Sequence, residues 1–105
     1  MHLAGKTQLD APEGMAVDQG RVYIVDTANH RVVAFDARSL SKLAQYPPAE
    51  WDATRCGKRY DQRDCPQDIA AHEGELFVSD THNDRIQVFN ANLDWIGVIG
   101  QVRVD

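Results

Sequence analysis

The chain contains one sequence pattern twice, and this repeat constrains its fold more than any other feature. Residues 12–37, PEGMAVDQGRVYIVDTANHRVVAFDA, align without a gap with residues 66–91, PQDIAAHEGELFVSDTHNDRIQVFNA, at an offset of 54 positions. Nine of the 26 aligned positions are identical. A repeat of this period is typical of folds in which similar units stack side by side and bury the faces of their neighbours.

Each repeat has the pattern of short strands separated by turns. In the first repeat, a proline precedes a short apolar run, and a polar turn with glycine follows. Two further runs, rich in β-branched and aromatic residues, come at residues 22–25 and 31–35, and the second repeat has the same order. Turn-forming residues separate these runs, which predicts three antiparallel strands joined by hairpins. We expect a fourth strand around residues 40–45 in the first repeat and 95–99 in the second.

Four antiparallel strands per repeat form one blade of a β-propeller. The sequence therefore predicts an all-β chain with two four-stranded antiparallel blades, whose central strands are apolar on both faces because neighbouring blades cover them. We expect residues 1–105 to form a single propeller segment, with blade one at about 12–45 and blade two at about 66–100. A charged loop insert at about 46–65 would join the two blades.

The composition excludes some classes of partner. The formal net charge is −5, which argues against nucleic-acid binding because phosphate contacts need a basic surface. No apolar run is long enough to span a membrane. The first residues lack the long apolar core of a signal peptide, so a cytoplasmic location is the default expectation.

The two repeats share a pattern that identifies a family. The pattern P-x-x-[MI]-A, followed by G-x-[VL]-[YF]-[IV]-x-D-T-x-N-x-R-[VI]-x-x-F, occurs in both copies and resembles the NHL repeat. The resemblance implies a β-propeller, most often with six blades, used mainly as a binding platform. Since a closed propeller needs at least four blades, we expect further blades from a longer parent chain or from assembly of copies into a ring-like trimer.

The resemblance implies a non-enzymatic segment that acts as a protein-interaction or ligand-binding platform without a cofactor. One alternative is a fragment of a propeller enzyme resembling the peptidyl amidating lyase. In that family, zinc-binding histidines follow the blade-opening proline, whereas Glu13 and Gln67 stand here. A second alternative is the substrate-binding propeller of a RING-type ubiquitin ligase, although no RING or B-box zinc module is present in the sequence. We find no motif for a nucleophile, a phosphate loop or a metal site, and predict no catalytic residue.

Both repeats place an acid, an amide and a guanidinium around one turn. The members are Asp26, Asn29 and Arg31 in the first repeat and Asp80, Asn83 and Arg85 in the second. A carboxylate at the end of a strand can accept backbone N–H bonds of the turn, and an arginine can pair with it. Because these residues recur in every blade, we interpret them as structural rather than as a unique active site.

Turn residues that differ between the repeats are better candidates for binding, because loops on a rigid scaffold acquire partners. The turn between the second and third strands lies on the same rim as the connection between blades. We therefore expect a protein or small ligand to bind there, with the histidines as contacts that titrate near neutrality. The candidates are Asn29, His30, Arg59, His82 and Asp84. We expect Asp18 and His72 on the opposite rim.

The insert contains two cysteines, Cys56 and Cys65. They could be two free thiols, one local disulfide that ties the insert, or half of a metal site that needs two further ligands. In an oxidising compartment we expect the disulfide, which would stabilise the insert by about 2–3 kcal/mol.

Overall fold

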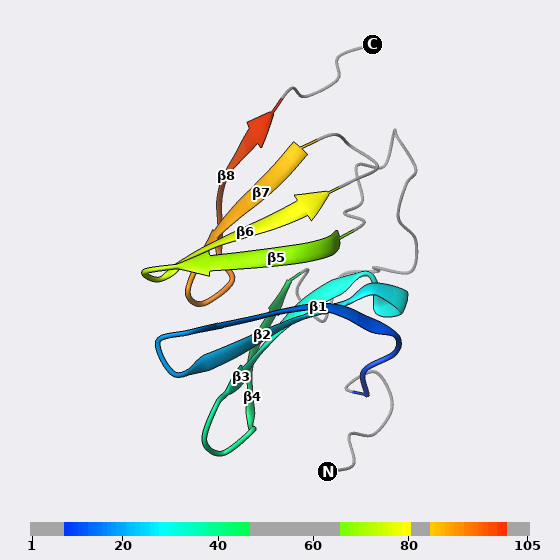
Figure 1. Ribbon diagram of the computed structural model, residues 1–105, viewed down its shortest axis with the longest axis vertical. Helices are drawn as coiled ribbons and strands as arrows, with labels where there is room; N and C mark the ends of the chain where they lie inside the picture. Colours follow the sequence, from blue (N-terminus) through cyan, green and yellow to red (C-terminus); the bar gives the residue numbers. More distant parts are fainter. Residues whose placement is uncertain (1–7, 47–65, 81–84, 101–105) are drawn as a thin grey trace.

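The computed structural model describes residues 8–46, 66–80 and 85–100, which form two four-stranded antiparallel sheets (Figure 1). In each sheet the strands lie in the order in which they occur in the chain, as the repeat pattern predicted. The first sheet contains β1 (Pro12–Asp18), β2 (Arg21–Asp26), β3 (Arg31–Asp36) and β4 (Lys42–Tyr46), with a short 3₁₀ turn, η2 (Thr27–Asn29), between β2 and β3. The second contains β5 (Pro66–His72), β6 (Glu75–Asp80), β7 (Arg85–Asn90) and β8 (Trp95–Gly100). The described residues include no helix long and apolar enough to cross a membrane.

The first hairpin of each blade closes through two residues in the left-handed region. Gln19 and Gly20 have φ of 50° and 79°, and Glu73 and Gly74 have φ of 48° and 87°. Two consecutive residues with positive φ form the primed turn whose twist matches that of the flanking strands. Glycine at the second position removes the steric cost of this conformation, which explains why the sequence repeats it there.

The last turn of each blade is closed by one side chain. Asp36 Oδ1 accepts a hydrogen bond from the backbone N–H of Arg38 at 2.8 Å, and Asn90 Oδ1 accepts one from that of Asn92 at 2.9 Å. These are Asx-type turns, so Arg38 and Asn92 occupy equivalent positions in the two blades. The turn in blade one is longer by one residue, and β4 accordingly begins at Lys42 rather than at the expected residue 40.

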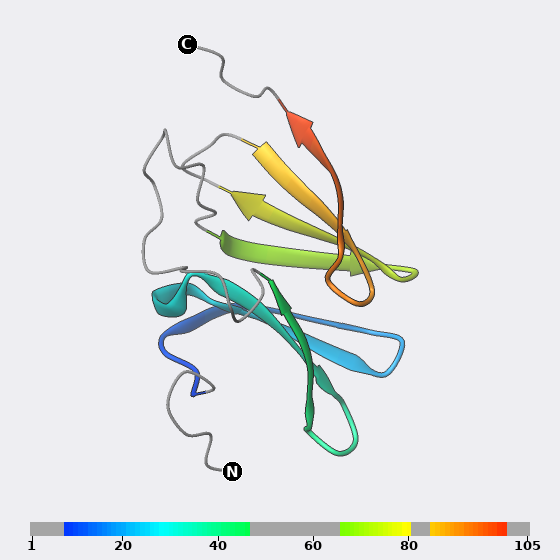
Figure 2. The same ribbon diagram turned by 180° about the vertical axis from the view of Figure 1, so that it is seen from behind.

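The two blades pack face to face and share one hydrophobic core. Strand β1 lies beside β5 in both views of the molecule (Figures 1 and 2), as the first strands of neighbouring propeller blades do. The core draws on strands from both sheets and consists of Tyr23, Val25, Val32, Ala34, Ile69, Leu76, Val78, Phe89 and Leu93. Burial of this apolar surface, at about 25 cal/mol per Å², fixes how one blade lies on the other.

Candidate functional site

The two rims of the molecule differ in which turns they carry. We use the name η2 rim for the edge formed by η2, the start of β1 and the end of β4. Tyr46 at the end of β4 pairs with Val32 near the start of β3, which places both at this edge. The hairpins that follow Asp18 and His72 lie at the opposite rim (Figure 1). The η2 turn and the hairpins that follow Asp18 and His72 therefore lie at opposite rims, while the turn with His82 and Asp84 lies outside the described residues.

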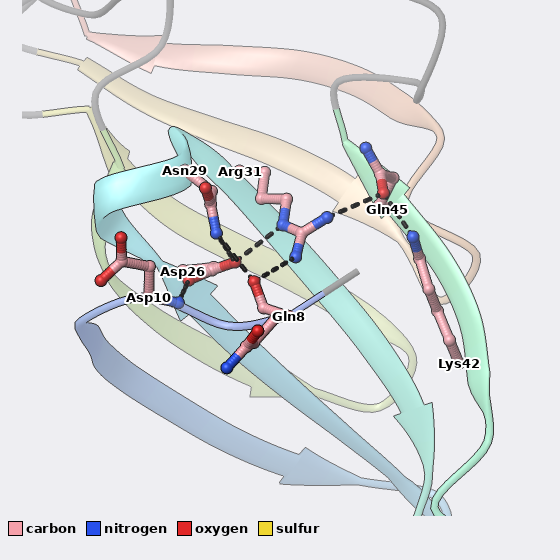
Figure 3. Close-up of polar contacts among 7 residues, drawn as sticks. All are labelled: Gln8, Asp10, Asp26, Asn29, Arg31, Lys42 and Gln45. Atoms are coloured by element: carbon pink, nitrogen blue, oxygen red, sulfur yellow. Dashed lines mark hydrogen bonds and ion pairs between the residues drawn. The ribbon is translucent and has the colours of Figure 1, made fainter. Parts of the chain in front are cut away.

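A buried network fixes the backbone of the η2 rim (Figure 3). Asp26 Oδ2 accepts hydrogen bonds from Arg31 Nε at 2.7 Å and from Asn29 Nδ2 at 2.8 Å. Asp26 Oδ1 accepts a third from the backbone N–H of Asp10 at 2.7 Å. This backbone donor belongs to the segment before β1, whereas the sequence led us to expect a donor in the turn itself. The carboxylate thus joins the entering chain to the turn.

The network continues through the guanidinium of Arg31. Its Nη2 donates to the backbone oxygen of Gln8 at 3.4 Å, and its Nη1 donates to Gln45 Oε1 at 3.3 Å. Lys42 Nζ donates to the same Gln45 oxygen at 2.5 Å. Partial burial lowers the pKa of Lys42, and the nearby charge of Arg31 lowers it further. One arginine therefore connects the segment before β1 to β4, across the whole width of the blade.

This geometry suits a structural role better than a chemical one. Asp26 is fully buried and Arg31 is 5% exposed, and the carboxylate already accepts from three donors. A fully buried carboxylate whose hydrogen-bond donors all belong to the same chain is not accessible to a substrate. In the described parts of the chain, no group of three metal-binding side chains is close enough to hold a metal ion.

The exposed part of the η2 rim is polar. His30 ends η2 in the left-handed conformation, with φ of 55° and ψ of 45°, and its backbone N–H donates to the oxygen of Thr27 at 3.0 Å. Thr27 Oγ1 in turn donates to Glu13 Oε1 at 3.3 Å. Within the described residues, His30 Nδ1 is buried and has no hydrogen-bond partner. The rim thus combines a carboxylate, a hydroxyl, an amide and an imidazole on a fixed backbone.

Only part of the predicted site lies in the described structure. Asn29 and His30 lie next to each other at the η2 rim, and Arg85 starts β7 opposite Asp80. The remaining predicted residues fall outside the described ranges, as does almost all of the insert: Arg59, His82, Asn83, Asp84, Cys56 and Cys65. Their roles stay predictions.

The sequence reasoning missed polar contacts that join the two blades. Arg21 Nη1 and the hydroxyl of Tyr23 both donate to the backbone oxygen of Ala91, at 2.7 and 2.8 Å. Asp18 Oδ2 accepts from the backbone N–H of Gly74 at 2.8 Å. Burial raises the pKa of Tyr23 above its usual value, which keeps the hydroxyl protonated as a donor. The sequence did contain a signal for these contacts, because Arg21, Tyr23 and Asp18 are each replaced by a different residue type in the second repeat.

Comparison with known proteins agrees with the fold and the repeat. A solved structure of apo AztD from Citrobacter koseri is similar over 85% of this chain, with 15% identity and a TM-score of 0.61. A luciferin-regenerating enzyme is similar over 90% of this chain, with 19% identity and a TM-score of 0.60. Identities this low show the fold alone. No curated protein sequence matches the chain.

The two similar structures are much longer than this chain, which spans 23% of AztD and 31% of the luciferin-regenerating enzyme. The sequence itself matches the NHL repeat at residues 9–35 and again at residues 64–89. The matched segments cover just over half of the chain and fall on the first three strands of each sheet. The chain therefore belongs to the NHL-repeat family and forms a two-blade segment of a β-propeller.

Proposed function

We propose that this segment is a non-enzymatic binding platform that holds a protein or a small polar ligand at the η2 rim. The observation that carries the proposal is the imidazole of His30, whose Nδ1 is buried and has no hydrogen-bond partner among the described residues. Leaving a buried polar group unpaired costs about 1–3 kcal/mol. Such groups are rare in native structures. His30 as a whole is half-buried, so a rotation of its ring on binding would bring this nitrogen to a partner and remove the cost.

The backbone around His30 is rigid enough to recognise a partner. Asp26 and Arg31 anchor both ends of the turn from the buried side, so little conformational entropy remains to be lost on binding. Glu13 and Thr27 present oxygen acceptors and a hydroxyl at the same rim. This mixture suits a peptide or another ligand with N–H or O–H groups. The net charge of −5 disfavours nucleic acid.

A pair of histidines on opposite rims allows a matched test. A partner is first identified by affinity capture on the immobilised chain, and its dissociation constant is then measured for two variants. We expect His30→Ala to weaken binding by about tenfold, the effect of losing one good polar contact. His72→Ala should leave binding unchanged, because His72 is exposed at the opposite rim. The proposal is wrong if the His72 variant loses the partner while the His30 variant keeps it.

A propeller enzyme is the second candidate, because the luciferin-regenerating enzyme has a similar fold and so shows that this fold can carry an active site. In the lyase family the zinc-binding residue after the blade-opening proline is a histidine, and Glu13 stands there instead; a carboxylate is a further ligand type that zinc accepts. Titration with zinc followed by calorimetry separates the candidates. Stoichiometric binding that is lost in Glu13→Ala would favour the enzyme, and a flat titration would favour the platform.

A further inference from the structure

Each blade has one sheet face that the other blade covers and one outer face that it leaves uncovered. The repeat makes the difference visible, because equivalent residues occupy the covered face of blade two and the outer face of blade one. Ile69 is 7% exposed, and its equivalent Met15 is 66% exposed. Leu93 is 3% exposed, and Leu40, in the same left-handed turn position of blade one, is 51% exposed. The outer face of blade one therefore has the composition of a blade interface without the neighbour.

The outer face of blade two matches the other side of the same interface. Within the chain, the ring of Tyr46 in blade one packs on Phe89 of blade two, with ring centroids 4.8 Å apart. The position equivalent to Tyr46 is Ile99, which pairs with β7 as Tyr46 pairs with β3 and is 55% exposed. The position equivalent to Phe89 is Phe35, on the outer face of blade one, where it is only 7% exposed in the single chain. The exposed apolar surface that faces Ile99 of another copy is therefore supplied mainly by Met15 and Leu40.

We propose that the outer face of blade two binds the outer face of blade one of a second copy of this chain. The contact repeats, between copies, the packing of blade one on blade two within the chain. It joins two different surfaces, and at the angle between neighbouring blades of a six-bladed propeller three copies close into a ring. Large exposed apolar residues on both faces supply the driving force.

Charge complementarity favours a second copy over an unrelated occupant. Within the chain, Arg21 Nη1 donates to Asn92 Oδ1 at 2.9 Å. The equivalent positions on the two outer faces are Glu75 for Arg21 and Arg38 for Asn92. Copies placed in the same geometry bring a carboxylate of one against a guanidinium of the next. Both groups are free to meet, since each residue is exposed in the isolated chain.

The mass of the purified full chain in solution tests the association. The resemblance to six-bladed propellers implies that three copies complete the ring. Light scattering after size exclusion should therefore give three times the chain mass of 11.8 kDa, with little change on dilution. A folded monomer at every concentration would overturn the proposal, and so would aggregates without a fixed mass. Either result would mean that the faces are covered by something other than a second copy.

Charge reversal tests the geometry. Glu75→Arg and Arg38→Glu should each raise the dissociation constant by about tenfold or more, because like charges then face each other. The double variant, Glu75→Arg with Arg38→Glu, restores opposite charges and should recover the assembly. Asp10→Arg, with the same change in charge at the η2 rim, serves as the control and should assemble normally. Circular dichroism shows that each variant is folded. If the double variant remains dissociated, or if the control dissociates equally, the proposed contact is wrong.

Discussion

Removal of the Asp26 carboxylate tests the conclusion that the repeated acid, amide and arginine stabilise the blade. In Asp26→Ala, the guanidinium of Arg31 stays 5% exposed and loses the oxygen that lies 2.7 Å from its Nε. The backbone N–H of Asp10 and the amide of Asn29 lose the same acceptor. A buried cation and two donors are therefore left without their main partner.

The expected cost follows from the burial of both partners. Breaking a buried ion pair by removing one partner costs about 3–5 kcal/mol, because the remaining charge is uncompensated. The free energy of unfolding of a small domain is only about 5–15 kcal/mol, so about a fifth of it or more would disappear. Asp26→Asn keeps one acceptor oxygen and should cost less, about 1–3 kcal/mol.

Urea unfolding at neutral pH, followed by circular dichroism, measures this loss. Asp10→Ala is the matched control, because Asp10 contributes its backbone N–H to the network and its carboxylate is dispensable there. We expect the control to change the free energy of unfolding by less than about 0.5 kcal/mol, as for an ordinary surface substitution. A loss below about 1 kcal/mol in Asp26→Ala, or equal losses in the two variants, would refute the structural interpretation.

Three further predictions concern the blade contact and one turn. Gly14→Ala should reduce the free energy of unfolding by about 1–3 kcal/mol, because the added Cβ would lie 2.9 Å from Asp68 Oδ1 and 3.1 Å from its Cα. Tyr23→Phe should reduce it by about 1 kcal/mol through loss of the bond from its hydroxyl to Ala91. Backbone hydrogen bonds from Ser39 and Arg38 lower the pKa of Asp36 below 3.8, so its contribution is present above about pH 4 and disappears as the pH falls through the lowered pKa. At pH 7 the Asp36→Asn variant should have about the same free energy of unfolding as the original chain, and this free energy should fall less in acid.

Each of these predictions has an internal comparison. Gly97→Ala is the control for Gly14→Ala, because no atom lies within 4 Å of an added Cβ there; equal losses would contradict the packing argument. The second repeat has phenylalanine, Phe77, where the first has Tyr23, so the phenylalanine variant should fold, and an unchanged free energy would show that the hydroxyl contributes nothing. An asparagine can close this turn, since Asn90 closes the equivalent turn of blade two. An Asp36→Asn variant as sensitive to acid as the original chain would assign that sensitivity to other carboxylates.

The sequence predicted the strands because their determinants are local. Alternating β-branched runs and the Gln19-Gly20 turn act over a few residues, and a second copy of the pattern confirmed each boundary. The pairing of Asp26 with Arg31 was also predictable, since the two residues lie opposite each other across one hairpin. The third donor to Asp26, the backbone N–H of Asp10, could not be predicted from the sequence. It lies outside the repeat, and no pattern in the sequence shows which N–H reaches a buried carboxylate.

Not every residue that differs between the repeats indicates a binding site, because some of these residues form the contact between the blades. Asp18 and His72 differ although they occupy equivalent turns. The structure explains the difference, because Asp18 accepts a hydrogen bond from the backbone N–H of Gly74 in the other blade. His72 has that position on the outer face of blade two, which blade one does not cover. Tyr23 differs from its equivalent for the same reason. Residues at equivalent positions of the two repeats can therefore differ for two reasons. One of them contacts a binding partner at a rim, or one lies where the two blades meet while its equivalent lies on an outer face. His30 is distinguished from the second class by its buried nitrogen without a partner among the described residues, and this is why we propose the η2 rim, rather than every asymmetric turn, as the binding site.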